Sequence, residues 1–107
     1  MTQFFFRTQD EFREYLDNIG FGAASTEEHL EGFARNVGGV VVRYGIYVFA
    51  IARYESSYIP VVYIASDHQS KKVTTIVHRW LSSDARFPDV GHAVEWCITM
   101  CKVNGGH

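Results

Sequence analysis

The sequence predicts an α+β fold: a mainly antiparallel four- to five-stranded sheet, in the element order β-α-α-β-β-β-β-α, with helices packed on one face. The first observation is the segment 37–65, which is almost wholly apolar or aromatic and is broken only by glycines and short polar patches. Such runs are typical of strands, and these are apolar on both faces. The second observation is that capped amphipathic segments lie before and after this run. Consecutive strands with helices segregated from them favour an α+β sandwich.

Chain length and composition predict a single domain over residues 1–107. The chain of 107 residues can hold one core of ordinary size and has no room for a second. Hydrophobic residues make up 47% of it, enough to bury such a core rather than remain disordered. No apolar run reaches about 18 residues, so no membrane-spanning helix is expected. With two cysteines and no signal peptide, a cytoplasmic location is expected.

The first third is predicted to hold a short strand and two helices. Residues 3–7 alternate apolar side chains between two faces, as a strand does. A capping box at 8–11 opens a helix that ends at Gly20, and a second box at 25–28 opens a helix that ends at Gly38. The two helices together predict a helical hairpin. Their apolar residues at helical spacing are expected to face the core: Phe12, Tyr15, Leu16, Ile19, Leu30, Phe33, Ala34 and Val37.

The sheet is predicted from the segment that follows. Strands are expected at 40–44 and 46–54, joined by a tight turn at Gly45, and then at 59–66 after a polar turn. Residues 73–81 fit one helical face, but five successive β-branched residues favour a strand instead, and we predict a strand.

The last helix is expected to begin after an Asp89 cap and to place Cys97 and Cys101 on its inner face. With His92 nearby, the two cysteines raise the alternative of a metal site. Zinc needs two further ligands, and the sequence has no second pair, so we predict neither a metal nor a cofactor. Apolar neighbours would raise the pKa of both thiols, which argues against a catalytic cysteine.

Acidic residues are concentrated in the predicted helical hairpin. Residues 1–37 hold seven acidic and three basic residues, whereas residues 38–107 hold five acidic and seven basic residues. An acidic helical face can engage a basic protein surface. A turn rich in tyrosine and serine adds residue types that are common in contact surfaces. The predicted partner-binding residues are Asp10, Glu14, Asp17, Glu27, Glu28, Glu31, Tyr54 and Tyr58.

The sequence contains no phosphate loop, nucleophile elbow or other familiar catalytic motif. We therefore expect a small non-catalytic protein-binding module. Its small size fits the accessory or inhibitor proteins that phages and mobile elements encode. The alternative is a small-molecule-binding protein or small enzyme, with a pocket between sheet and helices lined by Tyr47, Tyr63, His78 and Trp80.

Two further expectations concern partners. Three short helices would cover only one face of the sheet, so a homodimer is expected to bury the other face. That second face is expected to carry Val41, Tyr47, Phe49, Ile51 and Trp80. The formal net charge of −2 argues against nucleic acid as a partner, and no membrane association is expected.

Overall fold

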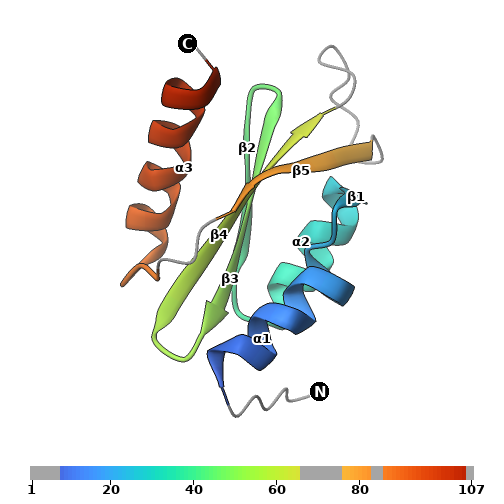
Figure 1. Ribbon diagram of the computed structural model, residues 1–107, viewed down its shortest axis with the longest axis vertical. Coiled ribbons are helices and arrows are strands. Elements are labelled where there is room, and N and C mark those ends of the chain that lie inside the picture. The colour runs from blue at the N-terminus through green and yellow to red at the C-terminus, as the bar shows by residue number, and fades with distance from the viewer. Residues whose placement is uncertain (1–7, 66–75, 83–85, 106–107) are drawn as a thin grey trace.

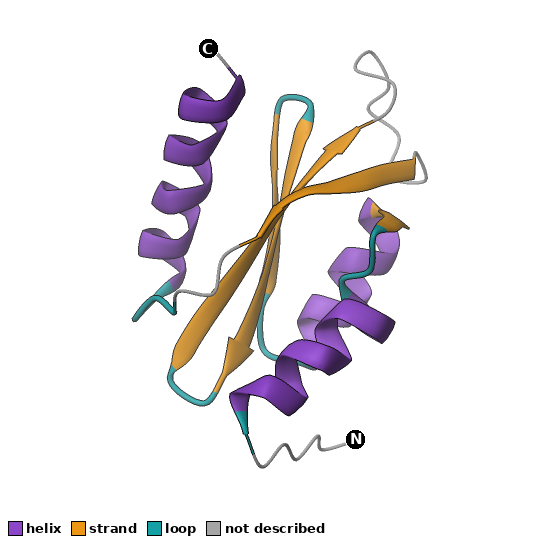
Figure 2. Ribbon diagram, in the orientation of Figure 1, coloured by secondary structure: helices purple, strands orange, loops and turns teal. Residues whose placement is uncertain are grey.

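A five-stranded antiparallel sheet lies between two helical layers in the computed structural model, which describes residues 8–65, 76–82 and 86–105 (Figure 1). The strands are β1 (Ala24–Thr26), β2 (Val40–Tyr44), β3 (Tyr47–Tyr54), β4 (Ser57–Ala65) and β5 (Ile76–Ser82). Their order across the sheet is β1-β5-β4-β3-β2, and every neighbouring pair is antiparallel. The predicted α+β class with an antiparallel sheet is confirmed (Figure 2).

Each of the first two helices is capped by a threonine. Thr8 is the predicted cap of the first helix, whereas the second capping box placed the cap one residue earlier, at Ser25. Thr8 precedes α1 (Gln9–Tyr15) and Thr26 precedes α2 (Glu27–Asn36). Each threonine hydroxyl accepts the backbone N–H three residues ahead at 3.2 Å, which satisfies a donor that the first helical turn leaves unpaired.

The last helix, α3 (Val90–Gly105), is preceded by Asp89, whose carboxylate accepts the backbone N–H of His92 at 2.8 Å. This confirms the predicted cap. Among the described residues, no helix is long and apolar enough to cross a membrane.

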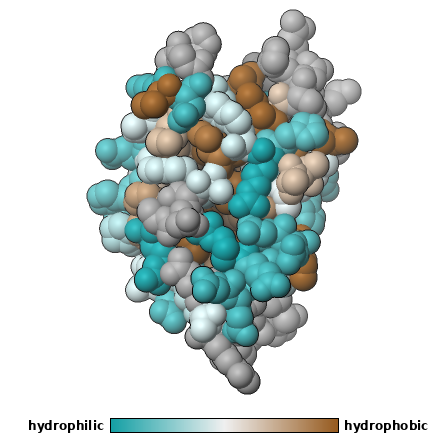
Figure 3. Space-filling view, in the orientation of Figure 1, coloured by the Kyte–Doolittle hydropathy of each residue, from teal (hydrophilic) through white to brown (hydrophobic). Residues whose placement is uncertain are grey.

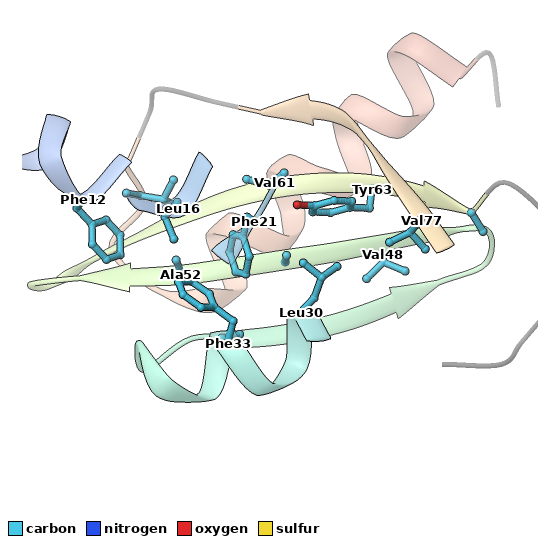
Figure 4. Packing of buried hydrophobic residues seen from close by; sticks show 14 residues of the cluster. Phe12, Leu16, Phe21, Leu30, Phe33, Val48, Ala52, Val61, Tyr63 and Val77 are labelled. Atoms are coloured by element: carbon cyan, nitrogen blue, oxygen red, sulfur yellow. The ribbon is translucent and has the colours of Figure 1, made fainter. Parts of the chain in front are cut away.

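The expectation that the helices pack on one face of the sheet is wrong. α1 and α2 lie on one side of the strands and α3 lies on the other (Figure 1). β3 and β4 are buried along most of their length because alternate side chains point into two separate cores. One core joins Phe12, Leu16 and Leu30 to the strands, and Figure 4 shows these side chains directed toward the sheet.

The second core lies under α3. Phe49 and Val62 of the sheet pack there with Cys97 and Cys101 of α3, and all four are buried. The predicted homodimer was meant to cover this face, but α3 already does so, and Phe49 and Ile51 are fully buried within one chain. The homodimer was predicted because one face of the sheet was expected to be uncovered, and that reason no longer holds. The homodimer stays an untested prediction.

The strand register also shows that Val41 does not lie on that face, as was expected. The turn between β2 and β3 contains two residues, Gly45 and Ile46, so Val41 pairs with Ala50 rather than with an odd-numbered residue of β3. Paired residues share a face, and Val41 therefore lies on the α2 side. Gly45 has a φ of +62°, a conformation that glycine adopts without a steric penalty.

The first helix ends differently from the prediction. After Tyr15 the chain forms η1 (Leu16–Gly20), a π-helical turn, instead of continuing as an α-helix. The wider turn breaks the 3.6-residue period, so Ile19 points outward and is 61% exposed instead of facing the core.

No strand was expected between the first two helices. β1 forms there and pairs with β5 far along the chain, so the helices do not make a plain hairpin. The strand prediction for 73–81 is confirmed from Ile76 onward. Residues 73–75 and the predicted strand at 3–7 lie outside the described residues.

Candidate functional site

The acidic residues of the predicted contact surface divide into two groups. Glu27 and Asp17 are held by arginines of the sheet. The carboxylate of Glu27 lies 2.7 Å from Nη1 of Arg43, and that of Asp17 lies 2.8 Å from Nη1 of Arg79. Glu27 is only 7% exposed. The first group therefore anchors the helical layer to the sheet and offers little charge to a partner.

A polar cluster fixes the end of η1 on the sheet. Nη1 of Arg79 donates a hydrogen bond to the carbonyl oxygen of Phe21 at 3.2 Å. The hydroxyl of Tyr63 donates one to the carbonyl oxygen of Gly22 at 2.6 Å. Burial raises the pKa of Tyr63, although the Arg79 guanidinium acts in the opposite direction. The phenol therefore stays protonated and continues to donate. Tyr63 acts as a structural residue in this position.

The second group of acidic residues remains exposed on the outer side of the helical layer. It consists of Asp10 and Glu14 of α1 and Glu28 and Glu31 of α2, and we call these four the acidic surface. α1 and α2 lie on the same side of the sheet, so the four carboxylates share one side of the molecule. In the view of Figure 3, hydrophilic side chains gather over α1.

An open hollow runs along α2 beside the acidic surface. Its volume is about 470 Å³, and it is lined by Thr26, Glu28, His29, Gly32, Phe33 and Asn36. The mixture of a carboxylate, an amide and an aromatic ring suits a long basic side chain, which carries an apolar stem and a charged head.

The two tyrosines predicted to contact a partner are both half-buried. The ring of Tyr54 stacks on Phe12 of α1 with centroids 4.9 Å apart. Tyr58 exchanges two backbone hydrogen bonds with Phe87, at 2.8 and 3.0 Å, and so ties the segment before α3 to β4. The structure therefore gives the Tyr54 ring a packing role, whereas the bonds of Tyr58 come from its backbone and do not depend on its side chain.

The four residues of the alternative pocket do not line one cavity. Tyr63 is fully buried on the α1–α2 side of the sheet, whereas Tyr47 and Trp80 pack with the core under α3. His78 is exposed and pairs with Ile64, which in turn pairs with Tyr47. The sheet therefore separates Tyr63 from the other three residues.

Two of these residues belong to an arrangement that the sequence did not reveal. The rings of Tyr47 and Trp80 stack with centroids 5.3 Å apart and planes inclined by 15°. Tyr44 continues the row, with its centroid 6.5 Å from that of Tyr47 and an inclination of 22°. We call Tyr44, Tyr47 and Trp80 the aromatic stack. Tyr44 is 41% exposed, and only the hairpin register, which pairs it with Tyr47, could have revealed its place.

The cysteine pair sits in the core, as the packing interpretation predicts. Cys97 is fully buried, and burial raises its pKa to about 12; burial also raises the pKa of Cys101. His92 is exposed, and its Nδ1 lies 2.9 Å from the carboxylate of Asp89. Within the described part of the chain, no three His, Cys, Asp or Glu side chains form a group that could hold a metal ion.

Both thiols should resist labelling in the folded protein. We expect a disulfide reagent at neutral pH to label Cys97 roughly a thousandfold more slowly than in denatured protein, because a pKa near 12 leaves very little thiolate. Absorbance of the released thiol would measure the rate with and without denaturant. Rapid labelling of the folded chain would contradict the buried assignment.

Comparisons with known proteins identify one family. A search of curated proteins and a search of solved structures each returned no match. The family model described as nucleotide modification associated domain 4 matches residues 21–101. The match begins at the end of η1, extends through the sheet and most of α3, and leaves α1 outside. The chain therefore belongs to the nucleotide modification associated domain 4 family.

Proposed function

We propose that this chain is a small cytoplasmic protein-binding module that serves nucleotide modification as an accessory or inhibitor protein, without catalysing the reaction itself. The observation that carries the proposal is the acidic surface. Asp17 and Glu27 are neutralised by arginines of the sheet, but the other four carboxylates remain exposed on one side of the molecule.

The partner that fits this surface is a protein with a basic face. Proteins that handle nucleotides or nucleic acids carry Lys- and Arg-rich surfaces for phosphate, and an acidic surface is complementary to them. The family description supports the proposal because it associates such domains with nucleotide modification. The hollow along α2 offers room beside Glu28 for one basic side chain of the partner.

Charge reversal on α2 tests the proposal. We expect Glu28→Lys combined with Glu31→Lys to abolish capture of a basic partner from an extract of the native host, while the melting temperature changes little. Both positions are exposed and lie within the segment that matches the family. Affinity capture at two salt concentrations with mass spectrometry would measure the effect, and added salt should weaken capture by the unaltered chain.

Glu95→Lys is the matched control. Glu95 is exposed on α3, on the opposite side of the sheet, so it undergoes the same chemical change away from the acidic surface. We expect this variant to capture the partner normally. Equal capture by all variants, or equal loss in the α2 and α3 variants, would contradict the proposal.

A further inference from the structure

β2 forms an open edge of the sheet. It is last in the strand order, and among the described residues only β3 pairs with it. At the other edge, β1 has three residues, and so short a strand offers little for another chain to pair with. β2 has five residues, which pair with β3 in unbroken register. The two edges of the sheet therefore differ in how well they are protected.

The sequence of β2 lacks the usual features that protect an edge strand. Such strands commonly carry lysine, proline or a bulge, which discourage pairing with another chain. β2 reads Val-Val-Val-Arg-Tyr, and its one charged side chain, that of Arg43, is directed to Glu27 of α2. Valine also has a high preference for strands. We therefore expect another strand to cover this edge.

The direction of the backbone groups shows what β2 presents to the edge. The carbonyl oxygen of Ile46, just before β3, accepts the backbone N–H of Ala65 in β4 at 2.9 Å. Backbone groups alternate in direction along a strand, so the next residue, Tyr47, bonds to its partner Tyr44 in β2. Val41 lies three residues before Tyr44, an odd number of steps. It therefore directs its N–H and C=O away from β3, to the open edge.

A small hollow lies beside this edge on the α2 side. Its volume is about 220 Å³, and it is lined by Glu31, Arg35, Gly39, Val40 and Val41. Gly39 has no side chain, which leaves room for a side chain of an added strand. Strands that add to an edge gain affinity from backbone hydrogen bonds and specificity from side chains placed in such hollows.

The hollow carries one charge of each sign. Glu31 and Arg35 are both exposed, and within the described part of the chain neither forms an ion pair. α2 runs antiparallel to β2, because Glu27 at its start contacts Arg43, whereas Arg35 near its end lies beside Gly39. Glu31 and Arg35 therefore lie at opposite ends of the hollow. A twofold axis through its middle would bring Glu31 of one copy opposite Arg35 of another.

We propose that a second copy of this chain covers the β2 edge. The two β2 strands pair antiparallel about a twofold axis beside Val40, perpendicular to the sheet, and join two five-stranded sheets into one. Val41 of each copy lies opposite Gly39 of the other and places its side chain in the hollow. Any strand can bond to an open edge, but a second copy also neutralises both charges of the hollow. Such self-complementarity is what a twofold interface requires.

This edge is separate from the partner-binding function proposed above, although Glu31 belongs to both surfaces. The dimer also differs from the one expected from the sequence, which was to bury the face that α3 covers. Arg35 lies outside the acidic surface, so Arg35→Glu should abolish the dimer and leave capture of a basic partner intact. Failure of one proposal can thus be told from failure of the other.

Charge reversal in two separate chains tests the dimer. We expect the unaltered chain to be a dimer by size-exclusion chromatography with light scattering. Arg35→Glu and Glu31→Arg should each be monomeric at the same concentration, because each places like charges across the twofold axis. Mixing the two monomers should restore a dimer, since one chain then supplies two acids and the other two bases. Thermal melting of each variant checks that the fold is retained.

Val41→Pro tests the backbone contact. Proline has no N–H to donate, and it is tolerated on an edge strand where the N–H faces outward. We expect this variant to melt as a folded protein and to be monomeric. Val41→Ile keeps the N–H and should remain a dimer.

Four results would overturn the inference: a monomeric unaltered chain, a dimer that both charge variants retain, charge variants that do not associate when mixed, or a folded Val41→Pro protein that remains a dimer. The last result would place the contact between copies on another surface. The charge variants decide the question by themselves if Val41→Pro does not fold.

Discussion

Glu27→Lys is expected to lower the free energy of unfolding by about 3 kcal/mol, because it breaks a nearly buried ion pair and leaves two cations facing each other. Glu27 is 7% exposed and its carboxylate lies 2.7 Å from Arg43. This loss of stability is at the lower end of the range for broken buried ion pairs, because a quarter of the Arg43 side chain remains accessible to solvent. Urea denaturation followed by circular dichroism would measure the change.

The neighbouring residue provides the control. Glu28→Lys makes the same chemical change at an exposed position in the same helical turn. We expect it to cost no more than about 1 kcal/mol, the loss that comes from placing a cation at the N-terminal end of the helix dipole. Combining Glu27→Lys with Arg43→Glu should recover part of the loss by restoring opposite charges. Equal stability of the Glu27→Lys and Glu28→Lys proteins would show that the ion pair is not structural.

Gly39→Ala is expected to destabilise the protein by about 3 kcal/mol, which is at the upper end of the stability cost of adding a group to a closely packed site. Gly39 lies just before β2, where a methyl group would overlap the backbone carbonyl of Ile51 in β3. Ile51 pairs with Val40, so relief would require β2 to separate from β3 where their pairing starts. The melting temperature and the urea midpoint would both fall.

Gly32→Ala is the matched control, with an expected change of opposite sign. Gly32 lies inside α2, and a methyl group there would meet nothing within 4 Å. Alanine has the higher helix propensity, so this variant should gain up to about 1 kcal/mol. If both variants lose equal stability, the close approach at Gly39 would not be the cause.

The parts of the fold that depend on local sequence could be predicted from it. The Thr8 and Asp89 caps, the buried face of α2 and the strand at Ile76 follow from hydrogen-bonding groups and side-chain periods within a few residues. The acidic character of the helical layer was equally visible, since it requires only counting charges.

Other features depend on partners far along the chain. β1 exists because Ala24, Ser25 and Thr26 pair with β5, and three such residues carry no strand signal of their own. The π-helical turn at Leu16–Gly20 likewise replaced a regular period that the apolar spacing predicted. No sequence pattern in either segment indicated these outcomes.

The sequence by itself determined that this chain forms an antiparallel sheet with strands apolar on both faces, because side-chain alternation is a local property. Only the tertiary structure decided what covers those faces. It placed α3 opposite α1 and α2, used Arg43 and Arg79 to neutralise two of the acidic residues, and set Tyr44 in line with Tyr47 and Trp80. The physical reason is that ion pairs, ring stacks and layer order join residues distant in sequence, where charge and hydropathy patterns carry no information about neighbours in space.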